Sequence, residues 1–260
     1  MRKIICIGAG RLAHHLMPEL ERAGCEVVQV YNRTEAAALL LAKRLGAASF
    51  TSDVRKIHKE ADAYFFTLAD DAIPQIAGQV GFLENHQSLF LHCSGVLPLA
   101  VLPFQLKGSF YPLQTFSPHH DIPWKTTPIL ITAEEVSIRK TLSALAHRVT
   151  ASVYEVTDEN KSILHLGAVF ANNFTNHMMA LAEKICFEHH VPFDILKPLI
   201  RETFEKALDG GPSKSQTGPA IRGDQKTIEK HMNLLAGHPG MQEIYQVITH
   251  SIREISGYNP

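Results

Sequence analysis

The most constraining feature of this sequence is a glycine-rich turn between a short apolar run and a helical stretch. The run Lys3–Ile7 is typical of a buried strand, and the six residues after it match the pattern G-x-G-x-x-G/A. The first glycine permits a tight turn, the second lets the backbone approach a pyrophosphate, and the small third residue lets helix and strand pack closely. The helix that follows offers free N–H groups and the positive end of its dipole to phosphates. We therefore expect a dinucleotide to contact the turn residues Gly8, Ala9, Gly10, Arg11 and Leu12.

The end of the second predicted strand indicates which dinucleotide is bound. The run Glu26–Tyr31 ends in Asn32, Arg33 and Thr34. A site for NAD has Asp or Glu there, to hold the ribose 2′-hydroxyl, whereas this chain has no acid. Arg33 can meet a 2′-phosphate with a planar fork of donors, and its two neighbours add neutral ones, so the sequence predicts NADP as the cofactor. The alternative is a Rossmann-like domain in which Arg33 is merely solvated.

The order of predicted elements divides the chain into an α/β part and a helical part. Strand-like and helical runs alternate up to about residue 156, which favours a Rossmann-type parallel sheet with helices on both faces. From Thr157 onward no strand-like run appears, and a long helix, capped by Asp158, is expected to run to about His189. We predict an NADP-binding domain at residues 1–154 and an all-helical domain for substrate binding and dimerisation at residues 155–260.

Composition excludes several classes of partner. The formal net charge of −1 over 260 residues gives no global field that would recruit nucleic acid or anionic membranes. No apolar run approaches the length of a membrane span. The four cysteines lack C-x-x-C spacing and the fifteen histidines include no H-E-x-x-H, so we expect reduced thiols, no metal site and a cytoplasmic protein.

Three further segments should reach the cofactor, because ligands of such sheets bind beyond the carboxyl ends of the strands, and one of them is Tyr111–Phe116. Leu68, Ala69 and Asp70 follow one predicted strand and are expected near the ribose and diphosphate. Ser94 and Gly95 follow the next and are expected at the nicotinamide. The open alternatives are that Asp70 or Asp71 only caps a helix and that His92 or Cys93 only packs within its strand.

A polar stripe on the long apolar helix is the strongest catalytic candidate. At 100° per residue, Lys161, His165, Asn172 and Asn176 fall within about 60° of one another. Buried polar groups need partners, so the stripe should face a cavity, a ligand or a bonded network. His165 is a candidate general acid, since histidine exchanges protons near neutral pH, and Asn172 would orient substrate or the cofactor amide. The alternative is a satisfied interior network with Lys161 in solvent. The other apolar side chains of this helix run most of the way round it, which favours burial against a second subunit.

A loop framed by glycines and prolines surrounds Arg222. Gly218, Pro219 and Gly223 suggest a fixed conformation, in which Arg222 could hold a substrate carboxylate or phosphate with two parallel hydrogen bonds. The alternative is an internal brace between Arg222 and Asp224.

With these motifs, the sequence resembles a little-characterised family of NADP oxidoreductases that is related to pyrroline-5-carboxylate reductase and to deazaflavin-dependent NADP oxidoreductases. The resemblance covers essentially the whole chain and rests on residues 8–10, 32–34, 92–95, 111–116, 165–174 and 217–224. It implies a Rossmann domain followed by a helical domain like that of 6-phosphogluconate dehydrogenase, often dimeric through the helices. More distant hydroxyacid dehydrogenases carry a catalytic Lys four residues before an Asn. If Asn172 is that Asn, Ala168 holds the Lys position, and His165 is the available substitute.

These observations favour an oxidoreductase that transfers hydride between NADP(H) and a small, anionic metabolite such as a carbonyl compound, an imine or a hydroxyacid. The catalytic residues would be His165, Asn172 and Arg222. Two alternative hypotheses are a sensor that binds NADP(H) without turnover and a methyltransferase. The absence of an acidic residue after the second predicted strand argues against the methyltransferase.

Overall fold

The chain folds into two compact units. The computed structural model describes residues 1–47, 49–85, 87–118 and 120–255. The first unit spans Met1–Phe170 and the second Ala171–Pro260, so the division falls inside a helical run. The boundary predicted between residues 154 and 155 falls inside the last strand, Val153–Glu155, and stays a prediction about where one function gives way to the other.

The first unit contains an eight-stranded, mostly parallel sheet, as far as the described residues extend. Its strand order is β3-β2-β1-β4-β5-β6-β7-β8, and only the pair β6–β7 is antiparallel. This arrangement confirms the predicted Rossmann-type sheet. The strands are β1 (Lys3–Ile7), β2 (Glu26–Tyr31), β3 (Ser49–Thr51), β4 (Ala63–Phe66), β5 (Leu89–His92), β6 (Lys107–Pro112), β7 (Ile129–Thr132) and β8 (Val153–Glu155).

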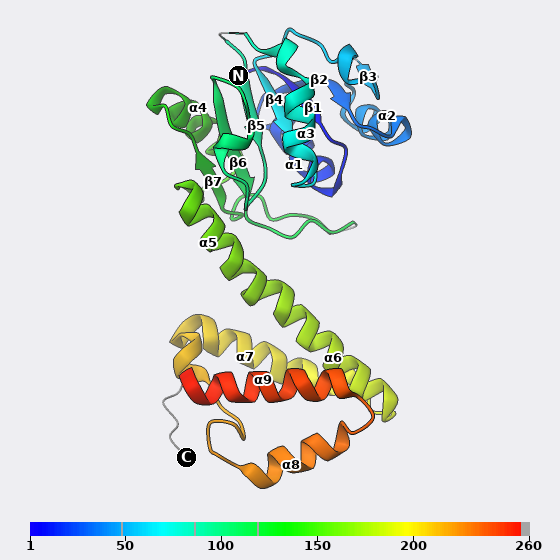
Figure 1. Ribbon diagram of the computed structural model, residues 1–260, viewed down its shortest axis with the longest axis vertical. Coiled ribbons are helices and arrows are strands. Elements are labelled where there is room, and N and C mark those ends of the chain that lie inside the picture. Colours follow the sequence, from blue (N-terminus) through cyan, green and yellow to red (C-terminus); the bar gives the residue numbers. More distant parts are fainter. Residues whose placement is uncertain (48, 86, 119, 256–260) are drawn as a thin grey trace. The chain divides into compact units, whose positions relative to one another are not determined.

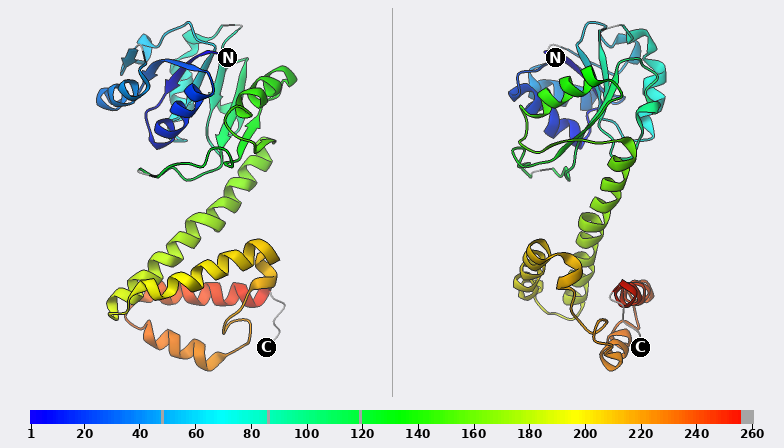
Figure 2. Two further views of the ribbon diagram at one scale, coloured as in Figure 1. Left: turned by 180° about the vertical axis from the view of Figure 1, so that it is seen from behind. Right: turned by 90° about the vertical axis from the view of Figure 1, so that its left-hand side faces the viewer.

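Helices cover both faces of this sheet (Figures 1 and 2). One face packs against α1 (Arg11–Arg22), α2 (Glu35–Leu45) and α4 (Val136–Ala146), and the other against α3 (Ala72–Gln79). The central strands β4 and β5 are buried along their whole length, which explains why they read as unbroken apolar runs. On α1 the buried side chains recur at helical spacing, at Ala13, Leu16, Met17 and Leu20.

The helical run after β8 is interrupted, which corrects the expectation of one unbroken α-helix. It consists of α5 (Asp158–Ala168), a π-helical turn at Val169–Phe174 and α6 (Thr175–Glu188). A π-turn bonds residue i to i+5, so the angles calculated for an unbroken α-helix do not hold beyond Ala168. The start of the run also differs from expectation: Thr157 caps α5 by accepting a hydrogen bond from Asn160 N at 3.1 Å, and Asp158 is the first helical residue.

The described part of the second unit contains helices and their connections, and no strand. Besides α6 it contains α7 (Lys197–Gly210), α8 (Gln225–Leu234) and α9 (Pro239–Ile255). Its buried apolar side chains, among the described residues, are Ala220, Ile228, Leu235 and Met241. No helix in the described part of the chain combines the length and the apolarity that crossing a membrane requires.

Candidate active site at the carboxyl edge of the sheet

The carboxyl ends of β1, β2, β4 and β5 converge at one edge of the first unit. Strand order reverses between β1 and β4, which is where open α/β sheets bind their ligands. Backbone hydrogen bonds hold the strand ends together: Gly8 N donates to Tyr31 O at 2.8 Å, and Cys93 N donates to Phe66 O at 3.2 Å. The predicted cofactor residues of these strand ends therefore belong to one edge of one sheet.

Gly8 forms a turn that no other residue type fits. Its φ of +112° lies in the region that favours glycine, and a Cβ there would lie 2.8 Å from both Thr67 O and Leu68 Cδ2. Its carbonyl accepts a hydrogen bond from Thr67 Oγ1 at 2.7 Å. The first glycine of the motif thus packs the end of β1 against the end of β4. The second, Gly10, precedes the first residue of α1.

The N-terminus of α1 is open to an anion. Gly10 occupies the N-cap position, no side chain caps the helix, and its first turn contains no acidic residue. One neighbouring N–H is already used, because Ala9 N donates to Asn32 Oδ1 at 3.1 Å, while Asn32 Nδ2 donates to Thr34 O at 3.1 Å. Asn32 therefore ties the glycine turn to the end of β2, and the N–H groups at the start of α1 remain to receive phosphate oxygens.

The end of β2 suits a phosphate. Arg33 is exposed, and its guanidinium has no ion-pair partner within 4 Å in the described part of the chain. Thr34 precedes α2 without a side-chain capping bond, so its hydroxyl is also available. The uncapped N-terminus of α1, which has no acidic residue in its first turn, the exposed Arg33 and the hydroxyl of Thr34 fit the phosphates of NADP.

The segment after β4 reaches the same edge. Leu68 is partly buried against Gly8, and Ala69 and Asp70 are exposed. Asp71 occupies the N-cap position of α3 but makes no capping bond with its side chain, so helix capping does not account for the acidic pair.

Beyond β5 the chain makes a tightly bonded loop. Ser94 Oγ accepts hydrogen bonds from Val96 N at 3.1 Å and from Leu97 N at 3.0 Å. Ser94 N donates to His92 Nδ1 at 3.2 Å, which requires this ring nitrogen to be unprotonated. His92 is fully buried, and burial lowers its pKa to about 3, so the ring stays neutral at physiological pH. His92 and Cys93 are thus packed within the fold, as the alternative interpretation has it, and His92 also holds Ser94.

Gly95 lies directly against a histidine–tyrosine pair. His165 Nδ1 and the hydroxyl of Tyr111 are 2.9 Å apart. A Cβ on Gly95 would come within 2.6 Å of His165 Nδ1 and 2.7 Å of Tyr111 Cζ, so only glycine fits between the loop and the pair. Burial, with a smaller contribution from the charge of Asp70, raises the pKa of Tyr111 to about 12 and keeps its hydroxyl protonated. The predicted acid His165 and the predicted nicotinamide residue Gly95 are therefore in contact.

Lys161, one turn before His165, is completely buried. Its Nζ donates to Leu97 O at 2.8 Å and to Asp158 Oδ1 at 3.0 Å, and burial lowers its pKa. The alternative that placed Lys161 in solvent is wrong. The pattern of polar residues at i and i+4 identified the correct helix face, but it could not show that the amine would reach a backbone carbonyl of another loop.

Asn172 and Arg222 lie in the second unit, Asn172 in the π-turn and Arg222 in the loop before α8. Asp224 caps α8, accepting from Thr227 N at 3.1 Å and from Thr227 Oγ1 at 2.8 Å. Arg222 is exposed and makes no ion pair with Asp224 within 4 Å; hydrogen bonds from Thr227 and, to a smaller extent, the charge of Arg222 lower the pKa of the Asp224 carboxyl. The predicted roles of Asn172 and Arg222 stay predictions.

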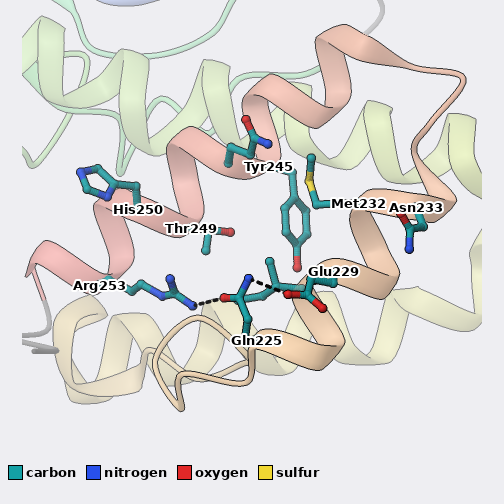
Figure 3. A pocket seen from close by; sticks show the side chains of 10 residues that line it. Gln225, Glu229, Met232, Asn233, Tyr245, Thr249, His250 and Arg253 are labelled. Atoms are coloured by element: carbon teal, nitrogen blue, oxygen red, sulfur yellow. Dashed lines mark hydrogen bonds between the residues drawn. The ribbon is translucent and has the colours of Figure 1, made fainter. Parts of the chain in front are cut away.

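Two hollows lie among the helices of the second unit, and neither is lined by a predicted site residue. One, of about 570 Å³, opens between α8 and α9; there Gln225 accepts from Arg253 and donates to Glu229 (Figure 3). The other, of about 390 Å³, is mostly apolar, and His231 Nδ1 lies 2.9 Å from the hydroxyl of Tyr245 in its wall. Single polar residues on amphipathic helices form no motif, so the sequence contained no signal for either hollow.

The described residues include no group of three or more His, Cys, Asp or Glu side chains that could hold a metal ion. The groups at this edge that can bind an anion or exchange a proton are the N-terminus of α1, Arg33 and the His165–Tyr111 pair.

Two protein-family profiles match parts of the chain. Residues 1–75 match the shikimate/quinate 5-dehydrogenase family, and residues 127–252 match a domain of unknown function, DUF2520. No curated protein matches the sequence.

Solved structures match the chain over nearly its full length. The reductive aminase of Aspergillus terreus, solved with NADPH and ethyl levulinate, is 14% identical, with a TM-score of 0.70 over 99% of this chain and 98% of its own. The pyrroline-5-carboxylate reductase of Coxiella burnetii is 14% identical, with a TM-score of 0.57 over 97% of this chain and 98% of its own. At such identities the likeness shows a shared fold.

A third structure shows the family. A Bacteroides fragilis protein assigned as an NADP oxidoreductase is 38% identical, covers 97% of this chain and 98% of its own, and superposes with a TM-score of 0.90. The aligned region covers nearly the whole chain, so the similarity extends over both the Rossmann-type unit and the helical unit. The chain belongs to the family of NADP oxidoreductases that this protein represents.

Proposed function

We propose that the protein is an NADP(H)-dependent oxidoreductase that transfers hydride to or from a small anionic metabolite, namely a carbonyl compound, an imine or a hydroxyacid. The observation that carries the proposal is the contact of Gly95 with the His165–Tyr111 pair, at the sheet edge where the glycine turn offers a dinucleotide site. A proton-exchanging group beside the nicotinamide position is what a carbonyl or imine reduction needs. Membership of an NADP oxidoreductase family supports the same activity.

The cofactor would be held by the residues of the sheet edge. The start of α1, at Gly10, Arg11 and Leu12, would bind the diphosphate through main-chain N–H groups. Arg33 and Thr34 would bind the 2′-phosphate, and Ser94 and Gly95 would line the nicotinamide pocket. When bound, NADP(H) supplies or accepts the hydride.

His165 would supply the proton that accompanies hydride transfer. Tyr111 keeps its hydroxyl proton and can donate it to Nδ1, which leaves Nε2 to carry the exchangeable proton toward the substrate. This arrangement orients the imidazole without a carboxylate. If Asn172 is the Asn that follows the catalytic Lys of more distant hydroxyacid dehydrogenases, His165 would also take the place of the Lys that Ala168 replaces.

The substrate would be anionic because Arg222 is exposed in a loop framed by Gly218 and Gly223, each of which has a positive φ. A guanidinium with no ion-pair partner within 4 Å among the described residues can bind a carboxylate or phosphate with two parallel bonds. Asn172 would orient the substrate or the cofactor amide.

We further propose that the protein is a cytoplasmic homodimer that assembles through its helical unit. Large apolar side chains are exposed on the helical unit, including Phe187 at 79%, Leu199 at 63% and Leu208 at 84%. The described part of this unit buries so few apolar side chains that it makes a poor core by itself, and a second copy would cover the rest. The four cysteines are all free, as suits a reducing compartment. Light scattering should give the mass of a dimer, and a monomer at micromolar concentration would refute this arrangement.

Thermal unfolding with and without nucleotides tests the cofactor assignment. A ligand present at about 100 times its Kd stabilises a fold by about 2.7 kcal/mol, so NADPH should raise the Tm clearly and NADH less. A carbonyl and imine screen would follow, in which His165→Ala should abolish turnover while NADPH binding persists. Binding without hydride exchange to any carbonyl or imine would favour a sensor, and no shift with any nicotinamide would overturn the proposal.

A further inference from the structure

The first turns of α5 are fastened to the loop that follows β5. Lys161 Nζ donates to Leu97 O at 2.8 Å, and Ser162 Oγ donates to Val96 O at 3.1 Å. Leu99 N donates to Asp158 Oδ2 at 2.8 Å, while the other oxygen of this carboxylate accepts from Lys161 at 3.0 Å. Three side chains of one helix thus bind three main-chain groups of one loop, and we call Asp158, Lys161 and Ser162 the α5 clamp.

A buried lysine is not the most stabilising residue for this position of the helix. Lys161 has no exposed surface, so its ammonium group has lost its hydration and has one carboxylate and one carbonyl as partners instead. A well-packed apolar side chain of similar volume would stabilise such a position at least as well. The amine lies between Asp158 and Leu97 O and bonds to both, so it ties the start of α5 to the loop.

The same loop is fastened from within. Ser94 Oγ occupies the N–H groups of Val96 and Leu97, and Ser94 N is held by His92. Among the described residues, the main-chain N–H and C=O of Gly95 have no hydrogen-bond partner. Gly95 is buried, so the bonds on either side of it hold a segment whose own N–H and C=O are unpaired within the described part of the chain.

We propose that the α5 clamp positions the Ser94–Gly95 segment against His165, and that Lys161 is its central positioning residue. Lys161 and His165 are separated by four residues on one α-helix, so they share a face and keep a fixed separation. Lys161, toward the start of α5, holds the loop, and His165, one turn further along the same helix, contacts Gly95 together with Tyr111. Lys161 touches no ligand position itself, so its role is distinct from that of the proposed acid.

This inference rests on the proposed function and has a test that does not require a substrate. NADP⁺ uses the whole cofactor site, whereas adenosine 2′,5′-bisphosphate carries the 2′-phosphate but no nicotinamide. Loss of the clamp should loosen the loop at the nicotinamide end of the site and leave the adenosine end unchanged. The Kd of each ligand can be measured by calorimetry for the full-length wild type, Lys161→Met and Ser162→Ala.

The expected result is selective weakening. In Lys161→Met the Kd for NADP⁺ should rise about tenfold, the loss expected when a pre-ordered loop becomes mobile, while that for the bisphosphate changes less than about twofold. Ser162→Ala removes one hydrogen bond at a partly exposed position and should raise the Kd for NADP⁺ about threefold. The matched control is Lys140→Met, an exposed lysine on α4, which should change neither value.

The outcomes separate the two proposals. If the variants weaken both ligands equally, or neither, the clamp has only a structural role and the inference is overturned while the cofactor site stands. If the wild type binds neither ligand, the proposed function fails and the inference with it. If Lys161→Met does not fold, Ser162→Ala decides: no selective loss of NADP⁺ binding refutes the clamp.

Discussion

Replacement of Gly95 by alanine should separate His165 from the loop after β5. The added methyl would lie 2.6 Å from His165 Nδ1 and 2.7 Å from Tyr111 Cζ, well inside van der Waals contact. Neither ring can yield freely, because the two are joined by a 2.9 Å hydrogen bond and Tyr111 is anchored in β6. Overpacking of this kind costs about 1–3 kcal/mol, so urea unfolding should show a loss of that size. NADP⁺ affinity and turnover should fall together, because the methyl intrudes at the nicotinamide position.

A second glycine gives a control of opposite sign. Gly78 lies inside α3, is exposed, and would have no atom within 4 Å of its Cβ. Gly78→Ala should therefore stabilise the protein by about 0.5–1 kcal/mol, the usual gain in a helix interior, without altering NADP⁺ binding. If Gly95→Ala were as stable and as active as the wild type, the close contact of Gly95 with the His165–Tyr111 pair would be refuted. Destabilisation with unchanged NADP⁺ affinity would remove Gly95 from the cofactor site.

Three further predictions follow from the same geometry. Arg33→Ala should weaken NADPH binding about 10- to 100-fold with little effect on NADH binding, because it removes charge-assisted hydrogen bonds to the 2′-phosphate. The control is Arg22→Ala: the side chain of Arg22 on α1 is 72% exposed, and its loss should leave both affinities unchanged. The pKa of His92 is lowered to about 3, so between about pH 6.5 and pH 3 the folded state binds fewer protons than the unfolded chain. The contribution of His92 to the free energy of unfolding should be complete above about pH 6.5 and fall on acidification toward pH 3, by at most about 1.4 kcal/mol per pH unit. In urea unfolding, the free energy of unfolding of His92→Gln should depend less steeply on pH than that of the wild type. Thr157→Ala should cost about 1 kcal/mol in the same assay by removing the N-cap of α5, and an unchanged unfolding midpoint would contradict the observed bond to Asn160 N.

Much of the first unit was readable in the sequence because its signals are local. The turn at Gly8 requires a positive φ, and an apolar run before it and a helix after it are sufficient to predict a strand–turn–helix unit. Strand β3 was missed because Ser49–Thr51 is too short to show a pattern. The antiparallel direction of β7 was missed because a buried strand reads the same in either direction.

The candidate site divides in the same way. Residue types at strand ends predicted the cofactor segments, and helical spacing predicted that Lys161 and His165 share a face. Neither could show that Tyr111 would meet His165, or that Leu97 O would receive the amine of Lys161, since these pairs are 54 and 64 residues apart in sequence. The π-turn at Val169–Phe174 was also beyond prediction, because its residues are compatible with an ordinary α-helix.

The order of amino acids thus specifies which segments become strands, turns and helices here, because backbone torsions and apolar periodicity act over a few residues. It also places the chemistry-bearing side chains at the ends of those segments. The sheet then decides which of those ends meet, and long-range packing buries Lys161 and closes Gly95 onto the His165–Tyr111 pair. Proximity across the fold depends on strand order and direction, which no local stretch of sequence encodes.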